Sequence, residues 1–65
     1  MKTREEVGAT LRRLRGNRTL KEAAAAIGIS WRTLQSYETG ARSPRDTKKA
    51  LIADYYGAKV ADIFF

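Results

Sequence analysis

The side chains best able to do chemistry in this chain lie in one stretch, residues 30–38, which is predicted to be a short helix. Ser30 is a favourable N-cap residue, and Leu34 and Tyr37 lie three apart, so they share an apolar face. The opposite face carries five polar or aromatic side chains: Trp31, Arg32, Thr33, Gln35 and Ser36. These residues include no nucleophile paired with a base, so the face suits recognition better than a reaction.

The rest of the chain also lacks the residues that most reactions and metal sites need. It has no cysteine and no histidine, which excludes disulfide bonds and the usual Cys/His zinc site. There is no Gly-rich phosphate loop, and the only close carboxylates, Glu5 and Glu6, are explained by helix capping. We therefore expect a protein that is not an enzyme, with no cofactor, no metal and no small-molecule ligand.

The charge of the chain points to a polyanionic partner. The 65 residues have a formal net charge of +6 and a sequence pI of about 10.2, which favours nucleic acid or an anionic membrane surface. The alternative is a solvated basic surface that only aids solubility. No apolar run approaches the roughly 20 residues that span a bilayer, and no secretory signal is visible. The lack of cysteine fits a cytoplasmic protein, and we expect no membrane partner.

Start and stop signals divide the chain into five predicted helices with short links. A Thr3/Glu6 capping box opens a helix over about 4–15, which ends before Gly16-Asn17. A second Thr-x-x-Glu pattern starts a helix at 19–27, which ends at Gly28.

The C-terminal half supplies the other predicted helices. Ser43 as N-cap and Pro44 in the first position predict a helix at 44–56 with Ile52 and Tyr56 buried. A last helix, 59–64, is weakly capped by Lys59. Because the length allows one domain at most, residues 1–65 are interpreted as a single all-α domain.

The second and third predicted helices have the spacing of a helix-turn-helix. Residues 19–27 and 30–38 are separated by a tight turn at Gly28. In such a pair the second helix places its N-terminal residues against base edges in the major groove. The helix N-termini at Thr19 and Ser30 also present backbone N–H groups, which suit phosphate binding.

The chain resembles a known family at these positions. The segment TLKEAAAAIGIS at 19–30, with Leu34, the Tyr-Glu-Thr-Gly run at 37–40 and Pro44, is similar to the Cro/repressor-type (Xre-like) helix-turn-helix family. The later residues Ala53, Tyr56-Gly57 and Asp62-Ile63-Phe64 also match, so the resemblance covers residues 4 to 65. It implies a compact five-helix lambda-repressor-like DNA-binding domain with the helix-turn-helix at helices two and three.

The resemblance also implies which side chains contact bases. The base-reading positions fall on Trp31, Arg32, Gln35 and Ser36, with Thr33 facing the groove or a phosphate. The Arg32 fork matches O6 and N7 of guanine, and Gln35 matches adenine. The alternatives are that Trp31 packs on a neighbouring helix and that Arg32 and Gln35 only form a solvated face.

Phosphate contacts are expected from the helix N-termini and from the loop after the third helix, at Thr19, Leu20, Ser30, Gly40, Arg42, Ser43 and Arg45. The family often has glutamine at the position of Leu20, and the leucine side chain has no amide group to make the same contact. Three other arginines either assist or only balance charge: Arg12, Arg13 and Arg18. In the family, the counterparts of Arg15 and Glu38 form a structural ion pair, although the link between the first two helices is about two residues shorter here.

Together these features predict a sequence-specific double-stranded DNA-binding transcription regulator that binds as a homodimer. Candidate dimer contacts are Tyr55, Phe64 and Phe65, with core packing as the alternative. The chain is either a stand-alone regulator or part of a longer protein. A second hypothesis is an antitoxin or other protein-interaction module that uses Trp31 and the apolar segment 63–65.

Overall fold

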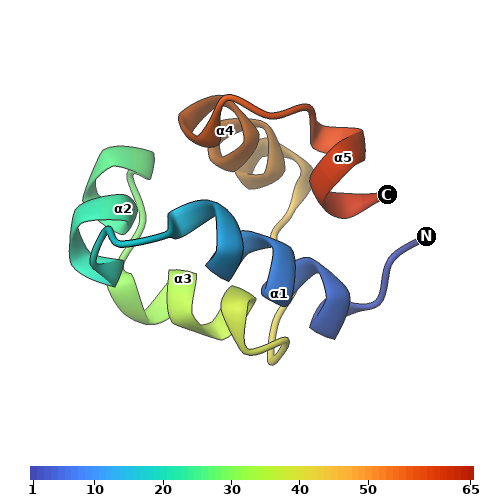
Figure 1. Cartoon of the computed structure of the whole chain (residues 1–65), viewed down its shortest axis with the longest axis horizontal. Helices are drawn as coiled ribbons and strands as arrows, with labels where there is room; N and C mark the ends of the chain where they lie inside the picture. The colour runs from blue at the N-terminus through green and yellow to red at the C-terminus, as the bar shows by residue number, and fades with distance from the viewer.

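The computed structural model describes all 65 residues and contains five α-helices and no strand (Figure 1). The helices are α1 (Arg4–Arg15), α2 (Leu20–Ile27), α3 (Trp31–Glu38), α4 (Asp46–Tyr56) and α5 (Val60–Phe64). In Figure 1, α3 runs below α1, α2 lies at one end of that pair, and α4 and α5 lie on the other side of α1. The all-α prediction is confirmed. No helix is long and apolar enough to cross a membrane.

The predicted N-caps of the first three helices are present. Thr3 Oγ1 accepts a hydrogen bond from Glu6 N at 3.1 Å, and Thr3 N donates to Glu6 Oε1 at 2.8 Å. The backbone bond from Thr3 lowers the pKa of the Glu6 carboxyl. At α2 the prediction of a full capping box is wrong. Thr19 Oγ1 accepts from Glu22 N at 3.0 Å, but Glu22 receives the Thr19 hydroxyl rather than its backbone N–H.

The predicted start of α4 is also wrong. The helix begins at Asp46 rather than Pro44, and its N-cap is Arg45, which makes no side-chain cap hydrogen bond. The reason is tertiary: the Pro44 ring is buried, while its neighbours Ser43 and Arg45 are exposed. Burying the ring keeps this segment non-helical as it crosses from α3 to α4.

One apolar cluster joins all five helices. Its buried members are Val7, Leu11, Ala23, Ala24, Ile27, Leu34, Tyr37, Ile52, Ala53, Ile63 and Phe64. Tyr56, predicted to be buried, packs against the cluster but is only partly covered. Phe64 belongs to the core, so the core-packing alternative holds for this candidate dimer contact, whereas Phe65 stays 54% exposed.

The backbones of two helices approach closely at Gly8, where α1 meets the end of α3. A Cβ atom added at Gly8 would lie 2.8 Å from both the Tyr37 carbonyl oxygen and the Glu38 carbonyl carbon. It would lie closer still to the Glu38 carbonyl oxygen. Only a residue without a side chain fits between these two backbones, so Gly8 sets how closely α3 packs on α1.

Candidate nucleic-acid interface

The turn between α2 and α3 sets the orientation of the candidate recognition helix. Gly28 adopts a left-handed conformation, with φ of 96°, and donates its N–H to Ala24 O at 2.8 Å. Ile29 N donates to the same carbonyl at 3.0 Å. Leu34 and Tyr37 are buried, so they attach the inner face of α3 to the core. The opposite face must therefore point outward.

The outward face carries the predicted base-contacting residues, but these differ in whether their hydrogen-bonding groups are free. The Arg32 and Gln35 side chains are exposed and make no hydrogen bond to the protein. Thr33 and Ser36 are partly buried. The Thr33 hydroxyl lies 2.8 Å from Ser30 Oγ, and Ser36 Oγ donates to Thr33 O at 2.6 Å. The side chains with free donors for an outside partner are thus chiefly Arg32 and Gln35.

Trp31 lies at the start of the same face. It is 37% exposed and is not part of the core cluster. The alternative in which Trp31 packs on a neighbouring helix therefore has no support. The Arg32 guanidinium carbon lies 5.4 Å from the centre of the Trp31 ring, within the range of a cation–π contact. The two side chains therefore form a pair on the surface of α3.

A positively charged hollow adjoins this face. Its volume is about 320 Å³, and it is lined by Thr33, Tyr37, Arg42, Ser43, Arg45 and Lys48. Three cations and no carboxylate line it, which is the electrostatic requirement of a phosphate site. The structure thus brings together three of the predicted phosphate residues, on the loop after α3. Lys48 was not predicted; its place one helical turn after Arg45 is the signal that could have revealed it.

Gly40 does not join this hollow. It is buried, and its N–H donates to Tyr37 O at 3.3 Å. A Cβ at this position would lie 3.3 Å from the Glu5 backbone, so Gly40 packs against the start of α1. Its backbone group is used inside the fold, and a phosphate contact through this residue has no support.

The N-termini of α2 and α3 offer backbone groups rather than side chains. The Thr19 and Ser30 hydroxyls accept from the N–H groups three residues later, at 3.0 and 3.1 Å. Leu20 packs partly against the core. The N–H groups of the first residues in a helix have no partner inside it, so both helix ends can still bind an anion.

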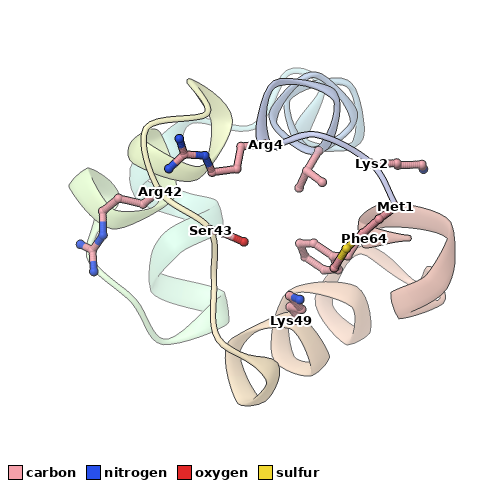
Figure 2. Close-up of a pocket in the computed structure, with 8 residues that line it drawn as sticks. Met1, Lys2, Arg4, Arg42, Ser43, Lys49 and Phe64 are labelled. Carbon is pink, nitrogen blue, oxygen red and sulfur yellow. The ribbon is translucent and has the colours of Figure 1, made fainter.

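A second, smaller hollow lies on the other side of the same loop (Figure 2). Its volume is about 50 Å³, and it is lined by Met1, Lys2, Arg4, Val7, Arg42, Ser43, Lys49 and Phe64. In Figure 2 the Ser43 hydroxyl, Lys49 and the Phe64 ring point into it, whereas Arg42 points outward. Lys49 lies over the rings of Phe64 and Phe65, at 5.6 and 5.0 Å. This ammonium group therefore stabilises the packing of α5 on α4.

An ion pair connects the end of α1 to the end of α3. Arg15 Nε and Nη2 donate to the two Glu38 carboxylate oxygens at 2.8 and 3.1 Å. Only 14% of the Arg15 side chain and 5% of the Glu38 side chain are exposed. The hydrogen bonds to Glu38 raise the pKa of Arg15. Arg15 Nη1 also donates to Arg18 O at 2.7 Å, so the short link between α1 and α2 is held by the same guanidinium.

Arg18 is also used within the fold. Its guanidinium lies about 5 Å from the ring centres of both Tyr55 and Tyr56 and donates to Leu14 O at 2.7 Å. The buried Tyr56 hydroxyl has no hydrogen-bond partner, and burial raises its pKa. Arg12 and Arg13 remain exposed. Of the three arginines that could either assist phosphate binding or only balance charge, Arg18 thus packs within the fold.

Comparison with known proteins agrees with this geometry. A family model for helix-turn-helix domains matches residues 6–63. Among solved structures, the clp gene regulator ClgR from C. glutamicum is similar, with 35% sequence identity and a TM-score of 0.80. The match covers 92% of this chain and 80% of the ClgR chain. No curated protein matches the sequence. The chain therefore belongs to the helix-turn-helix domain family, and its fold is that of the Cro/repressor-type (Xre-like) DNA-binding proteins that its sequence resembles.

Proposed function

We propose that this protein is a sequence-specific, double-stranded DNA-binding transcription regulator that acts without catalysis. The observation that carries the proposal is the outward face of α3, with free Arg32 and Gln35 side chains, beside a hollow lined by three cations and no carboxylate. A helix face that reads bases and an adjoining site that holds phosphate are the two parts that such recognition needs. The similarity to ClgR, which is described as a gene regulator, supports the regulatory role.

In the proposed complex α3 enters the major groove. Arg32 and Gln35 contact base edges, with Trp31 at the border of the groove. Thr33 and Ser36 have smaller roles, because their hydroxyl groups already have partners in the protein.

Phosphate groups of the backbone are bound at two places. The hollow supplies Arg42, Ser43, Arg45 and Lys48 for one phosphate. The backbone N–H groups that follow Thr19 and Ser30 suit others, on either side of the groove.

We further propose that residues 1–65 form one binding unit that occupies DNA as a homodimer in the cytoplasm. Half-sites lie about 34 Å apart in this mode, one helical turn of DNA. The chain measures 28 × 21 × 21 Å, so two copies fit side by side within that spacing. Leu51 and Phe65 are 47% and 54% exposed and provide apolar area for contact between the copies.

The test is selection of bound duplexes from a random library at physiological salt. The expected product is a palindromic site. On that site Arg32→Ala should cost about 1–3 kcal/mol and relax the preference at one base pair. Arg42→Ala should weaken binding to all duplexes and lower the slope against salt by about one. Lys59→Ala removes one positive charge from an exposed position at the start of α5, so it is the matched control.

The proposal fails if the library yields no preferred site, or if Arg32→Ala binds the selected site as tightly as the wild-type chain. The second candidate function, an antitoxin or other protein-interaction module, rests on exposed Trp31, Leu51 and Phe65. If the chain binds no duplex DNA even at low salt, that result would favour the protein-interaction alternative.

A further inference from the structure

The guanidinium of Arg32 has only one partner in the protein. It forms no hydrogen bond and no ion pair, and its contact is with the Trp31 ring, 5.4 Å from the centroid. Neighbouring residues on a helix point in different directions and do not normally face each other. The contact therefore requires the long arginine side chain to fold back over the indole. This is the interaction that selects one of the many conformations open to an exposed arginine.

The contact with the ring leaves the hydrogen-bond donors of Arg32 unused within the protein. The guanidinium carries five N–H donors, and none of them donates a hydrogen bond to a protein atom. Recognition of guanine uses two of these donors, which reach O6 and N7. The indole contact therefore leaves donors available for a base.

Trp31, the aromatic member of the pair, is itself held in place. Trp31 is the first residue of α3, directly after the Ser30 cap, whose Oγ accepts from Thr33 N at 3.1 Å. The cap fixes the first turn of the helix and with it the backbone that carries the ring. Trp31 is 37% exposed, so it supports Arg32 from the surface rather than from the core.

We propose that Trp31 is a positioning residue for Arg32: its indole ring holds the guanidinium in the orientation that reads a base pair. The selectivity of this protein at that one base pair then depends on both residues. This inference rests on the proposed DNA-binding function and adds to it the origin of the preference. An exposed cation–π contact is worth a factor of about two to five in an equilibrium constant. An arginine that is ordered before binding gives up less freedom when it meets the base.

The experiment measures binding of the wild-type chain and its variants to the selected site and to duplexes with each base pair replaced in turn. Trp31→Ala should weaken binding to the selected site about two- to five-fold. It should also reduce discrimination at the same base pair that Arg32→Ala affects. The variant with both changes should bind no more weakly than Arg32→Ala alone, because the two residues act through one contact. Trp31→Phe, which keeps an aromatic face, should retain most of the discrimination.

Three results would overturn the inference. Trp31→Ala could alter discrimination at a different base pair, which would make Trp31 a direct DNA contact. The loss of binding free energy in Trp31→Ala could add fully to the loss in Arg32→Ala when both changes are combined. Alternatively, Trp31→Ala could leave binding and selectivity unchanged. If the wild-type chain selects no site, the proposed function fails instead, and that result is distinct from these three. Gln35→Ala is the matched control and should affect another base pair.

A second measurement needs no DNA and stands even if one variant folds poorly. Protons that lie over an aromatic face are shifted upfield in NMR spectra by the ring current. The Arg32 Hδ protons should show this shift in the free wild-type chain, whereas those of exposed Arg45 should not. The shift should disappear in Trp31→Ala and shrink in Trp31→Phe. An unshifted Arg32 in the wild-type chain would show that the pair does not form.

Discussion

Replacing Gly8 with alanine tests how the recognition helix is positioned. Gly8 lies inside α1, where alanine is normally the better residue by about 0.5–1 kcal/mol. Helix propensity alone therefore predicts that Gly8→Ala stabilises the protein. The structure predicts the opposite, because the new Cβ would lie 2.8 Å from the Tyr37 carbonyl oxygen, against 3.4–4 Å for ordinary contact.

The size of the effect follows from what would have to move. The opposing atoms are backbone atoms of Tyr37 and Glu38, so no side chain can rotate away. Tyr37 is buried in the core and Glu38 is held by Arg15, so α3 is attached on both sides of the contact. Overpacking of this kind costs about 1–3 kcal/mol, and more where the backbone must shift. We expect Gly8→Ala to lose about 2–4 kcal/mol in the free energy of unfolding.

The assay is thermal unfolding followed by circular dichroism. For a domain of this size each kcal/mol corresponds to roughly 4–8 °C, so the melting temperature should fall by roughly 8–32 °C. The control is Ala9→Gly, at an exposed neighbouring position of α1, which should cost only about 0.5–1 kcal/mol. If Gly8→Ala melts at or above the wild-type temperature, helix propensity decides and the close approach of α1 and α3 is refuted.

Three further tests probe the interactions that hold α1 and α3 in place. Arg15→Met and Glu38→Gln should each lower the free energy of unfolding by about 3 kcal/mol in chemical denaturation, because either change leaves a nearly buried partner unpaired. The double variant should lose much less than the sum of the two, because it leaves no unpaired partner. Additive losses would show that the two side chains do not interact. Tyr56→Phe should leave the free energy of unfolding unchanged or raise it by up to about 1 kcal/mol, because it removes a buried hydroxyl that has no hydrogen-bond partner. A loss of about 2 kcal/mol or more would reveal a partner for that hydroxyl. The pKa of Glu6 is lowered by its bonds to Thr3, so its contribution to stability is present above the ordinary value of 4.5 and is lost as the pH falls through the folded-state pKa. The melting temperature of the wild-type chain should therefore fall more steeply than that of Glu6→Gln between about pH 6 and pH 3, and parallel curves would contradict the capping assignment.

Local signals were sufficient for most of the fold. Thr3, Thr19 and Ser30 marked the starts of three helices, and Gly16, Gly28 and Gly57 marked stops, because caps and left-handed turns depend on the residue type at one position. The start of α4 was mistaken because burial of the Pro44 ring overrides its preference for the first turn of a helix.

The candidate site was predictable only in part. The outward face of α3 follows from the 3.6-residue period, so Arg32 and Gln35 could be named from the sequence. The period does not reveal that the Thr33 and Ser36 hydroxyls already have partners, or that Lys48 joins the cationic hollow. These facts depend on side-chain conformation and on the path of the loop between α3 and α4.

The sequence by itself thus determined the helices, the turn at Gly28 and the residues available to meet a partner, because each is set by local periodicity and capping. The tertiary structure alone decided the distance between α1 and α3 at Gly8, the contacts of Arg18 and Gly40 within the fold, and the pairing of Trp31 with Arg32. The approach at Gly8 and the contacts of Arg18 and Gly40 join residues far apart in the chain, so they arise only when the helices share one core. The Trp31–Arg32 contact joins neighbours in the sequence, but it depends on a side-chain conformation that helix periodicity does not specify.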